Sequence, residues 1–229
     1  MIVSAIIPVA GRGTRLGGPV PKQYLKLNDE PIISITTRKF VSLPSIHHGV
    51  VVAAANEIEN TRQLLSNIED FSQKFKIVAG GNERQDSVYK GLEAIPSETD
   101  IVMVHDGVRP FLTTQMIDVS IQTAADSGAC VIAVPVKETI KRVMDQEVQE
   151  TIPRENLWQI QTPQTFKYHI LKEAHKKAKE ARYYSTDEAA LVEWCGYSVR
   201  VVMGSYSNIK ITTEEDLKIA RIFDQEGIN

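Results

Sequence analysis

Cysteine is scarce in this sequence, with only two residues among 229, Cys130 and Cys195. Neither takes part in a spacing typical of a metal site. Cys130 lies inside the apolar run 129–134, where a thiol packs like a small hydrophobic residue. We therefore expect both cysteines to be reduced packing residues, as is usual in a cytosolic protein.

Long apolar runs and a charge excess of one sign are also missing. The longest apolar runs have the length of a strand, which excludes a membrane span. The N-terminus enters a strand pattern at once, so we expect no signal peptide. The chain has 26 basic and 29 acidic residues and a net charge of −3, so it lacks the basic field of a nucleic-acid-binding protein. We expect a cytoplasmic protein without nucleic-acid or membrane partners.

Short β-branched runs alternate with helical patterns along the whole chain. This alternation is typical of a mostly parallel, doubly wound α/β sheet of the Rossmann type, whose ligands bind outside the carboxyl ends of the strands. We expect a single domain spanning residues 1–229. The predicted strands are 3–8, 49–54, 76–79, 101–104, 130–135, 158–161 and 198–203. The predicted helices are 31–42, 57–67, 83–94, 114–127, 167–182, 186–194 and 214–225.

Residues 137–156 break this rhythm, because they are polar and have the pattern of a hairpin that turns near 145–147. The segment is too polar for a pair of core strands. An isolated hairpin is marginal in water, so we expect this one to pack on another surface, such as a second subunit. The alternative is a flexible excursion of the chain.

The most informative segment is 8–22, which follows the apolar run 2–7 and contains four glycines. Its cations are Arg12, Arg15 and Lys22, and it has no acidic residue. Glycines let backbone N–H groups approach a ligand, and cations at the end of a strand favour phosphates. The segment matches neither the Walker loop nor the dinucleotide fingerprint. It predicts a polyphosphate pocket, and the alternative is a surface turn with solvated charges.

A second glycine motif occupies residues 80–87 and also follows a predicted strand. Asn82 and Gln85 have the spacing of a capping box that would open helix 83–94. Gly80 and Gly81 leave the backbone accessible, so main-chain groups and the hydroxyl of Ser87 could recognise a planar base.

A third motif, His105-Asp106-Gly107-Val108-Arg109, follows the run 101–104. A carboxylate at the carboxyl end of a central strand is a common Mg²⁺ position, because Mg²⁺ takes one or two carboxylates plus substrate phosphates. In the alternative interpretation, Asp106 caps a turn or pairs with Arg109. The basic loop expected at the same sheet edge favours the metal. We interpret His105 as structural.

A fourth motif surrounds Thr186. Ser185 and Glu188 have the spacing of a capping box for helix 186–194. Thr186 would then lie at the helix N-terminus, where free N–H groups and the helix dipole favour a phosphate.

A fifth motif is a short predicted strand, 207–212, that presents Lys210. In the alternative interpretation, Lys210 is an exposed lysine before a helix capped by Thr212 and Glu215.

In this order and spacing, the motifs resemble the 2-C-methyl-D-erythritol 4-phosphate cytidylyltransferase family of the non-mevalonate isoprenoid route. The resemblance spans essentially the whole chain, and its combination of motifs is far more specific than any one of them. It is carried by Pro8-Val9-Ala10-Gly11-Arg12-Gly13-Thr14-Arg15, Pro21-Lys22-Gln23, Gly80-Gly81-Asn82-Glu83-Arg84, Asp86-Ser87-Val88, His105-Asp106, Arg109-Pro110, Pro135-Val136, Thr139-Ile140-Lys141-Arg142, Arg154, Leu157-Trp158, Gln161-Thr162-Pro163-Gln164, Thr186-Asp187-Glu188 and Asn208-Ile209-Lys210.

The resemblance implies transfer of CMP from CTP to 2-C-methyl-D-erythritol 4-phosphate, with Mg²⁺ as cofactor. The catalytic residues implied are Arg15, Lys22, Arg154 and Lys210. The CTP-binding residues implied are Pro8, Val9, Ala10, Gly11, Arg12, Gly80, Gly81, Asn82 and Ser87. The residues implied for the sugar phosphate are Asp106, Arg109, Thr139, Thr162 and Thr186, with Asp106 also at the metal.

The resemblance also implies a homodimer in which the hairpin arm at 137–156 interlocks two subunits, so that Thr139 and Arg154 come from the partner. One departure from the family pattern is Ser207, because some relatives have an acid just before Asn-Ile-Lys. A cytidylyltransferase for another alditol phosphate, such as ribitol 5-phosphate, is the nearest alternative. A nucleotide-binding regulatory protein without catalysis is a second one, and the presence of Arg15, Lys22 and Asp106 argues against it.

Overall fold

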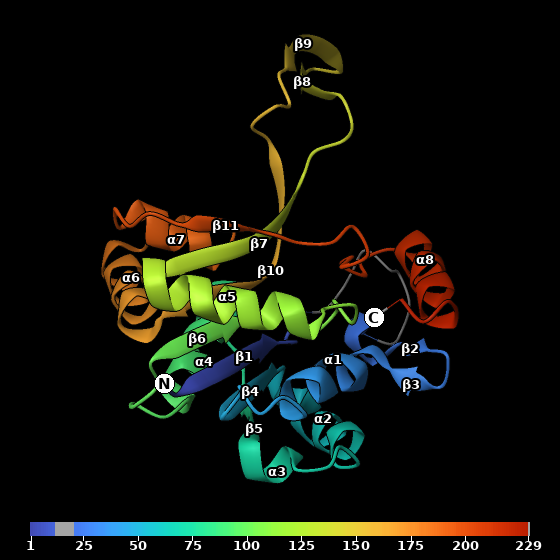
Figure 1. The fold of residues 1–229 in the computed structure, drawn as a ribbon, viewed down its shortest axis with the longest axis vertical. Coiled ribbons are helices and arrows are strands. Elements are labelled where there is room, and N and C mark those ends of the chain that lie inside the picture. Colours follow the sequence, from blue (N-terminus) through green and yellow to red (C-terminus); the bar gives the residue numbers. More distant parts are fainter. Residues whose placement is uncertain (12–20, 229) are drawn as a thin grey trace.

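A seven-stranded sheet forms the centre of the computed structural model, which describes residues 1–11 and 21–228 (Figure 1). The strand order is β11-β7-β10-β6-β1-β4-β5, and only β10 runs antiparallel to its neighbours. This arrangement confirms the predicted mostly parallel, doubly wound sheet. The strands are β1 (Val3–Pro8), β4 (His48–Ala53), β5 (Phe75–Ala79), β6 (Ile101–Val104), β7 (Ala129–Pro135), β10 (Trp158–Lys167) and β11 (Arg200–Met203).

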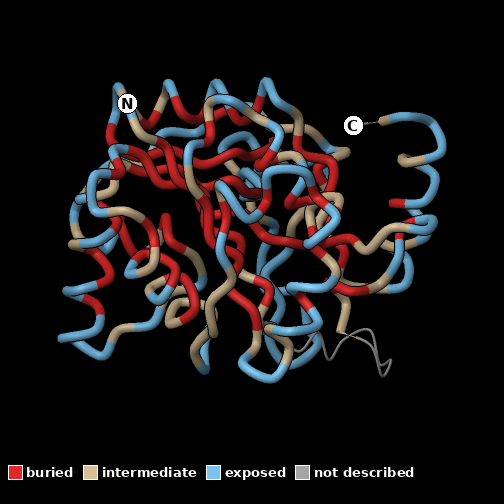
Figure 2. Tube along the Cα trace, turned by 90° about the horizontal axis from the view of Figure 1, so that it is seen from below, coloured by how far each residue is buried: buried red, intermediate tan, exposed pale blue. Residues whose placement is uncertain are grey.

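Helices cover both faces of this sheet, and the buried residues form a continuous layer inside them (Figure 2). Residues of α1, α2, α3 and α5 share one core cluster, and residues of α4, α6 and α7 share the other. The helices are α1 (Ile32–Val41), α2 (Ile58–Leu65), α3 (Phe71–Lys74), α4 (Arg84–Ala94), α5 (Thr114–Ser127), α6 (Tyr168–Ala181), α7 (Glu188–Trp194) and α8 (Glu214–Gln225).

The strand β1 shows how the sequence builds two cores at once. Val3, Ala5 and Ile7 belong to one cluster, whereas Ile6 belongs to the other. Successive side chains of a strand point to opposite faces of the sheet, so an unbroken apolar run fits a strand that is covered on both sides.

A third, smaller core lies where α8 meets the short strand β2 (Lys26–Leu27), which pairs with β3 (Glu30–Pro31). Val108 and Ile211 both pack there, and the N–H of Ile211 donates to the carbonyl of Val108 at 3.0 Å. This contact brings the segment before α8 against the segment after β6.

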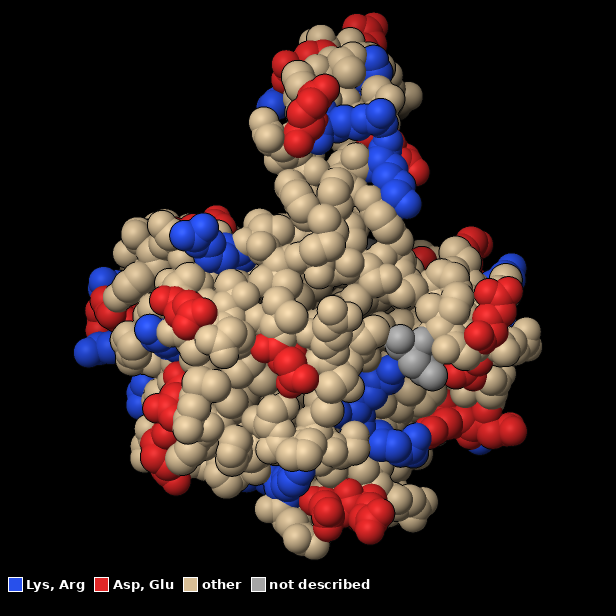
Figure 3. Space-filling view, viewed as in Figure 1, with Lys and Arg blue, Asp and Glu red and all other residues tan. Residues whose placement is uncertain are grey.

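The polar segment forms a two-stranded hairpin of β8 (Ile140–Met144) and β9 (Glu147–Ile152), which extends away from the sheet in Figure 1. Asp145 and Gln146 adopt positive φ angles of 50° and 66°, as a tight two-residue hairpin turn requires. The predicted turn position is therefore confirmed. Basic and acidic side chains are mixed on the hairpin (Figure 3), and most of its residues are exposed. Its role in a dimer remains a prediction.

Several predicted helix caps were wrong in position. Glu83, not Asn82, is the N-cap of α4 and forms a capping box with Asp86. Asp187, not Ser185, caps α7. Thr213, not Thr212, caps α8. In each case neighbouring residues are all able to cap, so the path of the chain after the preceding strand decides which one does.

The predicted strand 158–161 is longer than expected, because it continues as β10 through a register shift and a cis peptide bond between Thr162 and Pro163. The prediction of a strand at 207–212 was wrong, because this segment is a loop after β11. Both cysteines are free, as expected, and Cys130 is buried. Among the described helices, none is both long enough and apolar enough to cross a membrane.

Candidate functional site

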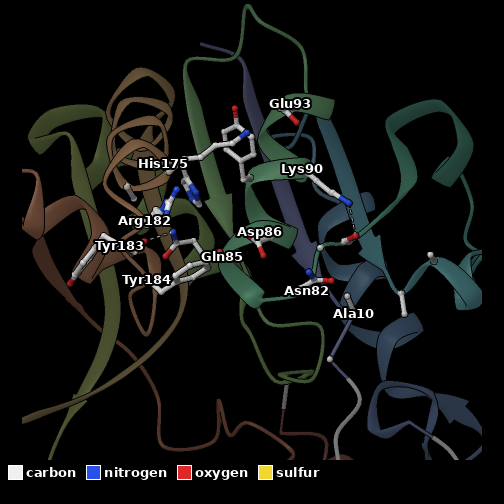
Figure 4. Close-up of a pocket in the computed structure, with 18 of the residues that line it drawn as sticks. Ala10, Asn82, Gln85, Asp86, Lys90, Glu93, His175, Arg182, Tyr183 and Tyr184 are labelled. Atoms are coloured by element: carbon white, nitrogen blue, oxygen red, sulfur yellow. Dashed lines mark hydrogen bonds between the residues drawn. The ribbon is translucent and has the colours of Figure 1, made fainter.

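The carboxyl ends of β1, β5 and β6 open on a cavity of about 150 Å³. It brings together ten of the residues that the sequence predicted for one site, namely Pro8, Val9, Ala10, Gly11, Lys22, Gly81, Asn82, Ser87, Asp106 and Lys210. A larger cavity of about 950 Å³ adjoins it and shares Ala10, Gly11, Gly81 and Asn82. In Figure 4, Ala10 and Asn82 lie at one end of this larger cavity, and His175 and Arg182 lie towards the other.

The segment around the first loop is tied to the sheet on both sides of the part that is not described. The N–H of Val9 donates to the carbonyl of Val52 at 2.8 Å. The side-chain amide of Gln23 donates to the carbonyl of Val9 at 2.8 Å. Lys22 precedes Gln23 in a short 3-10 helix, Lys22–Tyr24, and lines the smaller cavity. Arg12 and Arg15 lie outside the described residues.

The second glycine motif packs closely against the first. A Cβ on Gly80 would lie 2.7 Å from both the Cβ of Ala10 and the Oγ of Ser87, so only glycine fits there. The hydroxyl of Ser87 accepts from the N–H of Gly81 at 3.1 Å and donates to the carbonyl of Glu83 at 3.2 Å. Ser87 therefore holds the loop in shape, and the backbone of Gly80 and Gly81 is set beside the cavity.

Asp106 has the densest charge environment of the site. The residue is 7% exposed, and its carboxylate lies 2.9 Å from Nζ of Lys210, 3.6 Å from Nε of Arg109 and 3.4 Å from Nη2 of Arg84. Burial alone would raise the pKa of Asp106, but the charges of Arg84, Lys210 and Arg109 outweigh it and hold that pKa well below its ordinary value. The carboxylate is therefore ionised at neutral pH, and the pairing with Arg109 considered from the sequence is present.

His105 fixes the backbone around this carboxylate. Its Nε2 lies 3.1 Å from the carbonyl of Arg109, which can only accept, so Nε2 carries the proton. Its Nδ1 therefore accepts from the hydroxyl of Thr162 at 3.0 Å, and that oxygen accepts from the N–H of Asp106 at 3.0 Å. Burial lowers the pKa of His105 to about 4, so the ring is neutral and has the structural role expected for it. Thr162 is buried and lines neither of the described cavities.

Lys210 reaches Asp106 because its loop is held at several points. The side-chain amide of Asn208 donates to the carbonyl of Thr162 at 3.0 Å. The carbonyl of Asn208 accepts from Nη1 of Arg109 at 2.8 Å. The sequence suggested a strand as the support for Lys210, but the support is this set of hydrogen bonds from neighbouring loops.

Sequence reasoning missed the ion pair between Arg84 and Glu188. Nη1 of Arg84 lies 2.8 Å and 2.7 Å from the two carboxylate oxygens of Glu188, which is only 1% exposed. The prediction that Glu188 forms a capping box with Ser185 was therefore wrong. Burial raises the pKa of Glu188, and the charge of Arg84 opposes that rise. One signal in the sequence was the apolar run 189–192, which indicates that this helix begins inside the core.

Arg109 and Thr162 contact Asp106 but line neither of these cavities. Three further predicted site residues also line neither cavity, namely Thr139, Arg154 and Thr186. All three are exposed, and Nη1 of Arg154 donates to the carbonyl of Lys137 at the base of the hairpin. Two of the N–H groups that were expected to be free near Thr186 have partners. In the first turn of α7, the N–H groups of Ala189 and Ala190 donate to the side chains of Gln164 and Asp187.

The metal-binding capacity of the site rests on Asp106. The described part of the chain contains no group of three or more His, Cys, Asp or Glu side chains that could hold a metal ion. Lys210 and Arg109 contact Oδ2 of Asp106, whereas Arg84 contacts Oδ1 at 3.4 Å. A metal here would take most of its ligands from bound phosphates, and Mg²⁺ accepts that arrangement.

Comparisons with known proteins give one consistent result. The family model described as IspD, 2-C-methyl-D-erythritol 4-phosphate cytidylyltransferase, matches residues 3–225. A protein of that name from Halalkalibacterium halodurans is 47% identical over 220 residues, which cover 96% of each chain. Another from Geobacter metallireducens is 43% identical over 231 residues, which cover all of both chains.

Solved structures give the same result. The crystal structure of 4-diphosphocytidyl-2C-methyl-D-erythritol synthase from Anaerococcus prevotii is similar with a TM-score of 0.86 and 29% identity, and the match covers 98% of this chain and 96% of that one. The crystal structure of 2-C-methyl-D-erythritol 4-phosphate cytidylyltransferase from Thermus thermophilus has a TM-score of 0.80 and 30% identity, and the match covers 98% of this chain and all of that one.

Proposed function

Because the chain belongs to the 2-C-methyl-D-erythritol 4-phosphate cytidylyltransferase family, we propose that it transfers CMP from CTP to 2-C-methyl-D-erythritol 4-phosphate. The products are pyrophosphate and 4-diphosphocytidyl-2-C-methyl-D-erythritol. The observation that carries the proposal is a cavity in which Lys22 and Lys210 face glycine-rich backbone at the carboxyl ends of parallel strands. Such a cavity suits two polyanionic substrates.

In this proposal the phosphate of the alditol attacks the α-phosphorus of CTP, and pyrophosphate leaves on the opposite side. A phosphate monoester has a second pKa of about 6, so the nucleophile is already anionic at neutral pH and needs no general base. Catalysis then consists of positioning two anions and stabilising charge on the transferred group. The neutral, fully bonded ring of His105 is consistent with a site without a general base.

Each segment of the site has a proposed role. Pro8 to Gly11, with Gly80, Gly81 and Asn82, bind the nucleotide through their backbone, and Ser87 shapes that loop. Lys22 contacts the triphosphate, together with Arg12 and Arg15, which lie outside the described residues. Asp106, Arg109 and Lys210 meet the alditol phosphate, and Thr162 supports Asp106. The tight contact of Gly80 with Ala10 supports this division, because it keeps the two nucleotide-binding segments together.

The proposed cofactor is Mg²⁺, which would supply positive charge that offsets the charge of the bound triphosphate. Asp106 is the proposed protein ligand. Its ionised carboxylate at the edge of the cavity supports this assignment. A lone carboxylate is sufficient where the substrate supplies the other ligands.

The proposed assembly is a cytoplasmic homodimer joined by the hairpin arm. Thr139 and Arg154 would then complete the acceptor site of the other subunit, and Thr186 would contribute from its own. Support comes from the exposure of Val143, Met144 and Val148 on the hairpin, since a protruding pair of strands gains stability by packing on a second surface.

Pyrophosphate release tests the proposal and its nearest alternative together. With CTP as the second substrate, kcat/KM is measured for methylerythritol phosphate and for ribitol 5-phosphate. We expect a large preference for methylerythritol phosphate. A preference for ribitol 5-phosphate would move the protein to the alternative substrate class. CTP binding without turnover of either alditol would indicate a regulatory nucleotide-binding protein.

A further inference from the structure

Arg84 connects three segments that face the cavity. It is the first residue of α4, directly after the glycine motif at 80–83. Its guanidinium binds Glu188 at the start of α7 and lies 3.4 Å from Oδ1 of Asp106 at the end of β6. Arg84 itself lines the smaller cavity.

The pair with Glu188 is an unusual way to hold α7 in place. A buried ion pair seldom adds net stability, because the desolvation of two charges offsets their attraction. Packing alone could attach this helix, since Leu191 and Val192 are fully buried in the core. A charge pair at this position is therefore better explained by the orientation that it gives to the guanidinium.

The next residue, Gln85, adds a second tie to the same segment. Its amide nitrogen donates to the carbonyl of Tyr183 at 3.0 Å, and its amide oxygen accepts from the N–H of Ser185 at 3.0 Å. With these bonds, the first turn of α4 holds the segment 183–188 at two points. The guanidinium of Arg84 is thus fixed independently of Asp106.

The three cations around Asp106 do not act on the same oxygen. Lys210 and Arg109 make their recorded contacts with Oδ2, at 2.9 Å and 3.6 Å, whereas Arg84 makes its contact with Oδ1, at 3.4 Å. A carboxylate turns readily about its last side-chain bond, and contacts on one oxygen leave the other free to move. Arg84 therefore limits the direction in which the second oxygen of Asp106 points.

We propose that Arg84, anchored by Glu188, is a positioning residue that sets the orientation of the Asp106 carboxylate for the alditol phosphate. The proposal rests on the proposed function and deepens it, because it adds two residues to the acceptor half of the site. It differs from a direct role of Arg84 on the triphosphate, in which Arg84 would act without Asp106.

The test is a double-mutant cycle of Arg84→Lys and Asp106→Asn, with KM measured separately for CTP and for methylerythritol phosphate. Arg84→Lys keeps the charge but loses the fork that spans Glu188 and Asp106. Arg38→Lys is the matched control, because Arg38 forms a similar two-nitrogen pair with Glu30 on an exposed surface. Thermal melting of every variant shows whether it is folded.

We expect Arg84→Lys to raise the KM for methylerythritol phosphate about tenfold and to change the KM for CTP by less than about twofold, in the range of coupling between contacting residues. We expect the KM of the double variant for methylerythritol phosphate to be no more than about twofold above that of Asp106→Asn alone, because both changes remove the same function. Arg38→Lys should match the wild type. If Arg84→Lys does not fold, Glu188→Gln replaces it in the cycle, and the same KM pattern is expected.

Three outcomes would overturn the proposal. In the first, Arg84→Lys has no more effect than Arg38→Lys. In the second, Arg84→Lys mainly raises the KM for CTP. In the third, the loss of activity in the double variant equals the product of the losses in Arg84→Lys and Asp106→Asn. In each of these the wild type still releases pyrophosphate with methylerythritol phosphate, so the proposed function stands. A wild type that is inactive with this substrate would overturn the proposed function and this inference together.

Discussion

The ammonium nitrogen of Lys210 lies 2.9 Å from the carboxylate of Asp106, although the two residues belong to loops far apart in the chain. The pair forms because the loop after β11 is bonded to Thr162 and to Val108. Lys210 compensates the charge of Asp106, and Arg84 and Arg109 remain as additional cations beside it. This part of the cavity is therefore suited to an anion, although it contains a carboxylate.

Replacing Lys22 should impair the chemical step more than substrate binding. We expect Lys22→Ala to lower kcat by about 10²–10³, the usual loss when one charge-stabilising group is removed from an active site. Lys26→Ala is the matched control, because Lys26 is exposed on β2 nearby. Steady-state kinetics with both substrates varied distinguishes kcat from KM. A Lys22→Ala enzyme with near-normal kcat would remove Lys22 from the catalytic residues.

Activity should depend on a divalent cation. We expect no turnover in EDTA, recovery when Mg²⁺ is added, and a strong loss in Asp106→Asn. The charges around Asp106 hold its pKa well below the ordinary value, so it should not titrate between pH 5 and pH 9. The pH–rate profile of the wild type should accordingly show no acidic limb assignable to this carboxylate. Full activity in EDTA would contradict the proposed cofactor.

The stability of the folded protein should decrease as the pH is lowered, because the ring of His175 is buried. This side chain is 2% exposed, faces Tyr89 of α4 with ring centroids 5.9 Å apart, and has no hydrogen-bond partner for Nε2 among the described residues. Burial, with a smaller contribution from the charge of Arg84, lowers its pKa from 6.5 to about 4. The unfolded chain therefore binds an extra proton between these values, so stability is complete above pH 6.5 and declines towards pH 4.

This decline can be assigned with two variants of α6. We expect His175→Phe to lose about 2 kcal/mol less stability than the wild type between pH 8 and pH 5, measured by denaturant unfolding. His169→Gln, an exposed histidine of the same helix, should follow the wild type. Parallel pH curves for wild type and His175→Phe would show that His175 is not the group that titrates.

Mixing inactive variants should show whether the arm completes the neighbouring site. Lys22→Ala and Arg154→Ala are prepared separately, unfolded, mixed equally and refolded. About half of randomly paired dimers are mixed and have one intact site of two, so about a quarter of all sites should recover. As a control, Lys22→Ala mixed with Lys210→Ala should stay inactive, because both lysines line one cavity of the same chain. If Arg154 serves its own subunit, the first mixture also stays inactive.

Most of the fold could be predicted from the sequence, because strand and helix patterns depend on residues that are close together in the chain. Alternation of short apolar runs with helical patterns identified the sheet, and Asp106 lies at the carboxyl end of β6 as expected. The antiparallel direction of β10 was not predictable from its composition, because the residues of one strand do not reveal the direction of the strands beside it.

The site was predicted less completely, because some of its contacts depend on tertiary structure. Glu188 has a local explanation as a capping residue, and that explanation hid its bond to Arg84 on another helix. The support of Lys210 by Asn208 was hidden for the same reason, since these bonds come from loops distant in sequence. For a charged residue next to an apolar run, a contact with a distant part of the chain should therefore be considered beside a local role such as a helix cap.

The most direct test of the account follows the α-phosphorus of CTP. The wild type is incubated with Mg²⁺, methylerythritol phosphate and CTP labelled at that phosphorus, and the products are separated. The account predicts that the label moves into 4-diphosphocytidyl-2-C-methyl-D-erythritol, with one unlabelled pyrophosphate released for each product formed. Label recovered as CMP, or label that stays in CTP while the alditol phosphate is unchanged, would contradict it.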